Sequence, residues 1–174
     1  MVGTLGKEPG QMEENTQQGS INFAPIGQVI NDIEYPSHVK WENITSKVVI
    51  APQLVEALDG IDGFSHILII FYLHEVGEGR RSRLKVHPQG RKELPLTGVF
   101  ATRSPVRPNP IGVTVVKLLE RQKNVLKVLG LDAYDGTPVL DIKPYLRRDD
   151  LLKEATMPDW LLRLWELQDG SASA

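Results

Sequence analysis

Residues 103–112, RSPVRPNPIG, combine two arginines, one asparagine and three prolines. Each proline fixes φ, removes a backbone donor and keeps the preceding residue out of a helix. We therefore predict an ordered loop that loses little conformational entropy when it is held in one shape. Such a loop can direct Arg103, Arg107 and Asn109 at a fixed target, and an arginine fork suits phosphate, carboxylate or the face of a base. The structural alternative is a rigid crossover whose arginines meet nearby acids.

A second group of polar side chains lies in residues 130–145, GLDAYDGTPVLDIKPY. The DGTP sequence at 135–138 predicts a turn, because Asp-Gly tolerates left-handed backbone and Thr-Pro resumes an extended chain. Its spaced carboxylates could bind a cation or accept hydrogen bonds from ribose hydroxyls; they are Asp132, Asp135 and Asp141. A turn whose carboxylates cap backbone donors explains the same residues without function.

The histidines indicate neither a metal centre nor a hydrolase. The four of them, at positions 38, 66, 74 and 87, lack zinc-site spacing, and the chain has no cysteine, so we predict no metal site. Ser65 and His66 are adjacent at the entry to an apolar run. Neighbouring strand residues point to opposite faces, so we expect these two not to hydrogen-bond as nucleophile and base. We expect instead that Ser65 and His66 make a polar contact to a ligand at a barrel rim, or that His66 is a structural histidine.

The positive charge is concentrated in one region. Residues 80–121 hold ten of the twenty Lys and Arg residues and only two acids, Glu93 and Glu120, although the net charge is −2. A basic region of this kind offers a local positive field to phosphates. A solvated basic surface is the competing interpretation.

The composition indicates an ordinary globular domain. The chain has 174 residues, 41% of them hydrophobic and 24% charged, which suits one domain with a real core. The longest apolar run, ILIIFYL at 67–73, is far shorter than a membrane helix needs. No signal-peptide pattern opens the chain, and the lack of cysteine suits the cytosol. We therefore expect a cytoplasmic protein with no membrane span.

Segments typical of strands dominate the chain. They are rich in Val, Ile and aromatics and are bounded by turn formers; they cover 26–30, 44–50, 66–73, 98–102, 113–119 and 124–131. Residues 120–124 predict a hairpin between the last two. No Gly-x-Gly-x-x-Gly follows a first strand, so a Rossmann site is not indicated. Many short strands and few helices predict a mainly β fold, a single-sheeted antiparallel or mixed β-barrel.

Two helices are predicted. A short one begins near Pro52 and ends before Gly60. The other follows residues 157–159 and forms one apolar stripe, which we expect to serve packing or a subunit contact; it consists of Trp160, Leu161, Leu164 and Trp165. The predicted organisation is a disordered lead-in at 1–20, a barrel domain at 21–148, a helical segment at 149–168 and a flexible tail at 169–174.

Four blocks together resemble one family. They are PIGQV, LDGIDGFSHILIIFYLH, GVFATRSPVRPNPIGVTVVKLL and GLDAYDGTPVLDIKPY, in this order over residues 23–146. This pattern is similar to the TsaA/TrmO-like family of S-adenosylmethionine-dependent tRNA methyltransferases. The resemblance implies a β-barrel unlike the Rossmann methyltransferases, a homodimer, and a cofactor pocket near the subunit contact. It further implies N6-methylation of N6-threonylcarbamoyladenosine at position 37, in the anticodon loop of tRNA.

The resemblance also implies roles for particular residues. We expect His66 or Asp135 to act as the base. Expected contacts to S-adenosylmethionine come from the first block, from the Ser-His pair of the second block and from the fourth block: Pro25, Ile26, Gly27, Ser65, His66, Leu131, Asp132, Asp135, Gly136 and Thr137. Expected contacts to tRNA are Arg81, Arg83, Arg91, Arg103, Arg107 and Asn109. Because some family members carry a further C-terminal domain, we expect this shorter chain to hold tRNA through the barrel itself. A barrel that binds S-adenosylmethionine or RNA without chemistry, and a methyltransferase for another substrate, are the alternatives.

Overall fold

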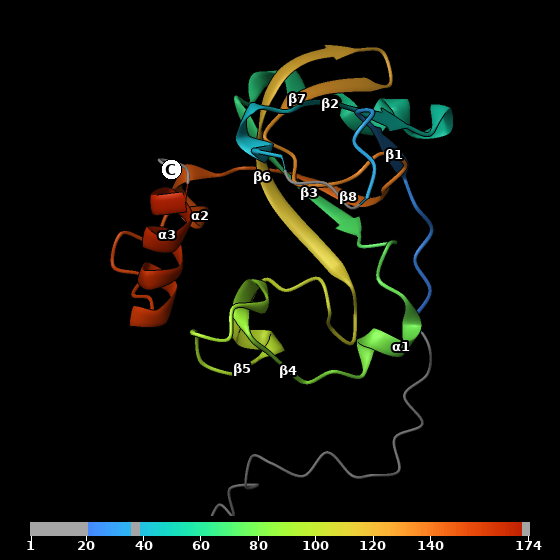
Figure 1. Ribbon diagram of the computed structural model, residues 1–174. Helices are drawn as coiled ribbons and strands as arrows, with labels where there is room; N and C mark the ends of the chain where they lie inside the picture. The colour runs from blue at the N-terminus through green and yellow to red at the C-terminus, as the bar shows by residue number, and fades with distance from the viewer. Residues whose placement is uncertain (1–20, 36–38, 172–174) are drawn as a thin grey trace, which may run out of the picture.

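Six strands close into a barrel in the order β1-β2-β7-β6-β3-β8, and every pairing is antiparallel (Figure 1). This computed structural model describes residues 21–35 and 39–171; the segment 1–20 predicted as a lead-in lies outside the described residues. The barrel strands are β1 (Gly27–Ile30), β2 (Thr45–Ile50), β3 (His66–Tyr72), β6 (Ile111–Gln122), β7 (Val125–Leu129) and β8 (Pro138–Pro144). The predicted single-sheeted β-barrel is confirmed.

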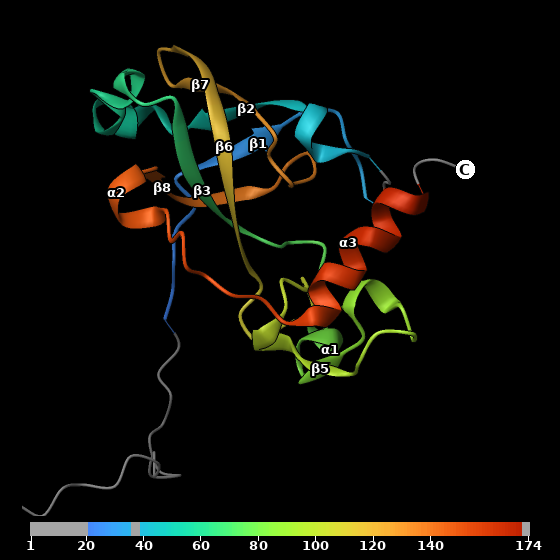
Figure 2. The same cartoon turned by 90° about the vertical axis from the view of Figure 1, so that its left-hand side faces the viewer.

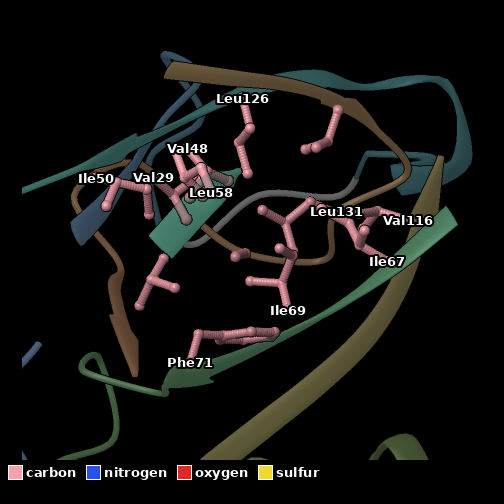
Figure 3. Close-up of a cluster of buried hydrophobic side chains, with 13 residues drawn as sticks. Val29, Val48, Ile50, Leu58, Ile67, Ile69, Phe71, Val116, Leu126 and Leu131 are labelled. Carbon is pink, nitrogen blue, oxygen red and sulfur yellow. The ribbon is translucent and has the colours of Figure 1, made fainter. Parts of the chain in front are cut away.

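Alternation along the strands fills the barrel. In β3, Ile67, Ile69 and Phe71 point inward and are buried, while the residues between them face outward. Figure 3 shows the resulting cluster of apolar side chains from β1, β2, β3, β6 and β7. Burial of this apolar surface is the main stabilisation of the barrel. The strand β8, which the sequence analysis left as extended chain after the DGTP turn, closes the barrel between β1 and β3.

The outer surface of β3 and β6 is also apolar. Three residues of β3 pair across the strands with three of β6, and all six face away from the core: Leu68 with Val115, Ile70 with Val113, and Tyr72 with Ile111. We call these six residues the outer β3–β6 face. An antiparallel strand with one solvated face normally alternates apolar and polar residues, so this face departs from that pattern.

The segment between β3 and β6 forms a small unit below the barrel in Figure 1. It contains α1 (Glu78–Arg81), β4 (Lys85–Val86), a 3₁₀ turn at Pro88–Gly90, β5 (Thr97–Gly98) and a 3₁₀ turn at Val99–Ala101. The prediction of a strand at 98–102 is wrong. The two-residue strand β4 can pair only Thr97 and Gly98, and the Thr102 hydroxyl then donates to the Val99 carbonyl (2.9 Å), which closes a turn.

The helical predictions are largely confirmed. Residues Pro52–Leu58 form a 3₁₀ helix, followed by Gly60 at φ 84°. Further 3₁₀ turns lie at Trp41–Asn43 and Ile61–Gly63, and α2 spans Arg147–Asp150. The C-terminal helix α3 covers Asp159–Ser171 and lies beside the unit below the barrel (Figure 2). It therefore enters the predicted tail at 169–174, whose last three residues lie outside the described ranges. No helix in the described residues has the length and apolar character to cross a membrane.

Candidate active site at the barrel rim

One cavity of about 470 Å³ lies where four segments meet. These segments are the end of β3 with residues 73–76, the loop at 103–107, the start of β6, and the turn before β8. Its lining includes Arg103 and Arg107 from the proline-rich motif at 103–112. It also includes Asp132 and Thr137 from the acidic motif at 130–145. The fold thus brings the two motifs together at one rim of the barrel. A more open hollow of about 900 Å³ is lined by the single exposed segment 147–155.

The proline loop is fixed by hydroxyl groups as well as by prolines. The backbone N–H of Ser104 donates to the Thr102 hydroxyl (3.2 Å), and that of Val106 donates to the Ser104 hydroxyl (3.2 Å). The Val106 side chain is buried. Arg103 and Arg107 form no ion pair or hydrogen bond with other described residues. The rigid-crossover alternative, in which these arginines meet acids, therefore does not describe this loop.

The turn before β8 is held by the side-chain amide of Asn31 and by backbone hydrogen bonds. The Asn31 side chain donates to the Ser46 hydroxyl (2.9 Å) and to the Ala133 carbonyl (2.8 Å). Its own carbonyl oxygen accepts from the Ile33 N–H (3.1 Å). Backbone bonds from Asp135 and Gly136 to Ile33 and Val29 complete the attachment. The Asp132 and Thr137 side chains are consequently held in fixed positions at the cavity. Asn31 was missed by the sequence analysis, since an isolated Asn after a strand carries no spacing signal.

Asp132 is one of two acidic residues that line the cavity; the other is Glu75. Desolvation by the surrounding protein raises the pKa of the Asp132 carboxyl, although the residue as a whole is exposed. No described cation pairs with it. Asp132 therefore offers an uncompensated carboxylate to a cationic or hydroxyl-bearing ligand.

The cavity also contains a histidine that the sequence analysis did not select. His74 lies just beyond β3, with Nδ1 3.3 Å from the Thr137 hydroxyl oxygen and Nε2 3.1 Å from Oε1 of Glu75. The only local signal for His74 in the sequence is its place in LHE, directly after an apolar strand. The contact to Thr137 joins residues 63 positions apart, so no local pattern could have found it.

His66 lies at the opposite end of β3, about 20 Å from Tyr72 at 3.3 Å per residue, and does not line the cavity. Its Nδ1 is 2.9 Å from the Ser65 hydroxyl oxygen. The expectation that Ser65 and His66 do not hydrogen-bond is wrong, because Ser65 precedes the strand and is not bound by strand alternation. Both residues are exposed, and the His66 ring lies near Tyr145.

The other expected cofactor residues are distributed around the turn and β1. Asp135 is exposed, and its carboxylate accepts from the Asn31 backbone N–H (3.0 Å), the capping role foreseen as the alternative. Leu131 belongs to the core, and Gly136 adopts φ 72° in the turn. Pro25, Ile26 and Gly27 enter β1, and none of them lines the cavity. Of the expected set, Asp132 and Thr137 line it.

The expected tRNA contacts fall into separate groups. Arg81 and Asn109 line a second hollow of about 680 Å³, which residues 108–110 of the proline loop border. There the Arg81 guanidinium donates to the Tyr72 hydroxyl and lies over its ring. Arg83 is exposed after α1, and Arg91 pairs with Glu93 (3.2 Å).

Another member of the basic region has a structural role. Arg121 donates to the Leu58 carbonyl (2.8 Å) and pairs with Asp59 (3.1 Å) and Asp62 (3.5 Å). It therefore fixes the 3₁₀ segment against β6.

The fold and the cavity define a class: a closed β-barrel with a cavity of small-ligand size at its rim, without the doubly wound architecture. The chain belongs to a family within this class, since residues 16–151 match the model of the tRNA-methyltransferase O N-terminal domain. The resemblance stated from the four sequence blocks is confirmed.

Similar proteins support the same family assignment. The chain is 40% identical over 136 residues to a probable S-adenosyl-L-methionine-binding protein of Methanothermobacter thermautotrophicus, covering 76% of this chain and 95% of that protein. It is 40% identical over 125 residues to the tRNA (adenine(37)-N6)-methyltransferase of Escherichia coli, covering 70% of this chain and 53% of that protein. The predicted class of enzyme and its predicted cofactor are thereby confirmed at the level of the family.

The crystal structure of TrmO from Pseudomonas aeruginosa is similar, with a TM-score of 0.62 and 30% identity over 79% of this chain. Another TrmO crystal structure gives a TM-score of 0.64 and 32% identity over 80% of this chain. The chain spans 61% and 64% of those two chains. The similarity therefore covers somewhat less than two thirds of each of those chains.

Proposed function

We propose that this chain transfers the methyl group of S-adenosylmethionine to N6 of N6-threonylcarbamoyladenosine at position 37 of tRNA. One observation carries the proposal: Arg103 and Arg107 line the same 470 Å³ cavity as Asp132 and Thr137. A site that joins a sulfonium donor to a nucleic acid needs an acidic group and free cationic groups at close quarters, and this rim offers both.

The cavity suits the donor. Its volume lies in the range of small-ligand sites, and Phe71, Leu73 and Ala133 give it apolar walls. Asp132 would hold a ribose hydroxyl or the donor's positive charge, and its raised pKa marks a carboxylate that gains from a cationic partner. The bound donor supplies an activated methyl group. The protein contributes mainly position and a preorganised electrostatic environment.

The arginines suit the acceptor. Arg107 is half-buried in the cavity wall and Arg103 is exposed at its edge. We assign Arg107 to the carboxylate of the threonyl group, which a guanidinium fork can hold through two hydrogen bonds. Arg103 then contacts anticodon-loop phosphates, and Arg83 is a further exposed cation of the basic region. The target base lies in a single-stranded loop, which lowers the free energy of splaying it into the cavity.

The outer β3–β6 face supports a homodimer. Val113 and Val115 are each 46% exposed in the centre of this face, while Asp141 and Lys143 form an ion pair on the adjoining strand β8 (2.7 Å). An apolar centre with a charged border is typical of a subunit contact. Ile111 and Val113 also line the cavity, so a second copy on this face would lie next to the site. We assign the enzyme to the cytoplasm, where its tRNA substrate is available.

A nucleoside-level assay tests the function. Purified protein and labelled S-adenosylmethionine are incubated with tRNA that carries or lacks the threonylcarbamoyl group, and the digested nucleosides are analysed by mass spectrometry. We expect methyl transfer only to the modified tRNA. The Arg107→Ala variant should lose this discrimination, whereas Arg103→Ala should weaken binding of both tRNAs and reduce the salt dependence. Equal methylation of both tRNAs by the wild-type protein would exclude threonylcarbamoyladenosine as the acceptor.

A non-catalytic S-adenosylmethionine-binding barrel is the second candidate, because archaeal relatives are named only as binding proteins. Calorimetry distinguishes the two. Donor binding without methylation of either tRNA would favour the binding protein.

A further inference from the structure

We propose that His74 is the general base that accepts the proton of the methylated nitrogen, with Glu75 and Thr137 as its positioning residues. The inference rests on the proposed function and adds a catalytic group to it. A urea-like nitrogen is a weak nucleophile, so its proton must leave during or before attack, and this requires a base within reach of the acceptor.

The contacts of His74 fix its tautomer. A carboxylate can only accept hydrogen bonds, so the nitrogen that faces Glu75 at 3.1 Å, Nε2, carries the hydrogen. In the neutral ring this leaves the lone pair on Nδ1, which faces the Thr137 hydroxyl at 3.3 Å. This lone pair therefore lies on the side of the turn that lines the cavity, where the Thr137 hydroxyl can relay a proton to it.

Both charge states of the ring are accommodated. The Thr137 hydroxyl can donate to neutral Nδ1 and can accept from Nδ1–H after protonation. Thr137 is only 2% exposed, so its hydroxyl has little access to bulk water and is held by the backbone bonds of the turn. The Glu75 carboxylate stabilises the imidazolium that forms. This arrangement of hydroxyl, imidazole and carboxylate is the one that an efficient proton acceptor requires.

The proposed step balances in atoms and charge. The acceptor N–H bond breaks as the nitrogen–methyl bond forms. Its proton passes to the Thr137 hydroxyl oxygen, and the proton of that hydroxyl moves to Nδ1 of His74. The electron pair of the methyl–sulfur bond stays on sulfur, which leaves a neutral thioether. One positive charge is thus lost at the donor and one appears on the imidazole beside Glu75, so the net charge of the cavity does not change.

The other titratable groups fit this role less well. His66 and Asp135 lie outside the cavity. Asp132 lines it but has no partner among the described residues to orient it as a base, and we assign it to the donor. The titratable and charged groups that line the cavity with His74 are Tyr35, Glu75, Arg80, Arg103, Arg107, Asp132 and Tyr134.

The experiment compares single-turnover methylation of threonylcarbamoylated tRNA by the full chain and by His74→Gln, as a function of pH. We expect the wild-type rate to show an acid limb. His74→Gln should be slower by about 100-fold or more and should lack that limb, while S-adenosylmethionine binding by calorimetry changes by less than about threefold. Added imidazole should restore part of the rate of His74→Ala.

Matched variants separate chemistry from folding. Thr137→Ser keeps the hydroxyl and should retain most of the rate, whereas Thr137→Val should lose it with donor binding intact. Two outcomes would overturn the assignment of His74 as the base and leave the proposed function standing. In the first, His74→Gln is as active as an active wild type. In the second, Asp132→Asn removes the acid limb and His74→Gln keeps it. An inactive wild type overturns the proposed function and the base with it.

Discussion

Gly112 and Phe71 are paired across β6 and β3, and the Phe71 ring occupies the space that a side chain at Gly112 would need. A β-carbon built on Gly112 would lie 2.5 Å from the ring. Both residues line the rim cavity. The RPNPIG motif therefore ends in glycine for a packing reason: the ring forms the floor of the cavity because nothing projects from the next strand.

We expect Gly112→Ala to displace the Phe71 ring toward the cavity and to weaken S-adenosylmethionine binding by more than about tenfold. The ring is buried and cannot move freely, so overpacking should also lower stability by about 1–3 kcal/mol. Calorimetry and thermal unfolding measure the two effects. Gly98→Ala is the control, since open space surrounds that position; an equal loss in both variants would contradict the packing argument.

Asn31→Ala should destabilise the protein and disturb the site together. The change removes three hydrogen bonds and leaves the Ser46 hydroxyl, 1% exposed, without its amide donor. We expect a loss of about 2–3 kcal/mol in urea unfolding and weaker donor binding at a temperature where the variant remains folded. Exposed Gln122→Ala should change neither property. Normal donor affinity in a folded Asn31→Ala protein would show that the turn keeps its position without this amide.

Asp132→Asn should stabilise the protein in a pH-dependent way. Burial raises the pKa of Asp132, so the folded chain holds this proton more tightly than the unfolded chain does. Below the ordinary aspartate pKa the carboxyl is protonated in both states and costs nothing. As the pH rises through the raised pKa, ionisation reduces the stability of the wild type.

Melting curves of both proteins between about pH 3 and pH 7 should therefore separate as the pH rises, with the variant above the wild type at neutral pH. The gain should be small, because the side chain still contacts solvent. Donor binding should weaken in the same variant. A difference in melting temperature that is constant with pH would contradict the assignment of the effect to this carboxyl.

Val113→Asp should dissociate the proposed homodimer. The substitution puts a charge at the centre of the outer β3–β6 face, where burial against a second copy would leave it without a partner. Sedimentation velocity of the wild type should show a dimer, and that of the variant a monomer. Lys47→Glu, on the exposed side of β2, should leave the assembly unchanged. A wild type that sediments as a monomer at micromolar concentration would exclude this face as a stable subunit contact.

The strands were largely predictable, but their partners were not. Apolar runs and turn residues indicated β1, β2, β3, β6 and β7 within a few positions, because alternation and β-branched composition are local properties. The prediction of a strand at 98–102 was wrong, because the available pairing partner, β4, has only two residues. The strand β8 was recognised only as extended chain, since its role depends on closing the barrel between β1 and β3.

The sequence alone determined the class of fold, the family and two of the motifs that form the rim, because proline, glycine and charged residues at fixed spacing restrict the backbone wherever they occur. Only the tertiary structure decided which residues share the cavity. His66 and His74 lie in one short stretch of sequence, yet β3 carries them to opposite ends of the strand. Thr137 contacts His74 because it directly precedes β8, which pairs with β3. Contacts between residues so distant along the chain depend on strand order and register, which no single segment encodes.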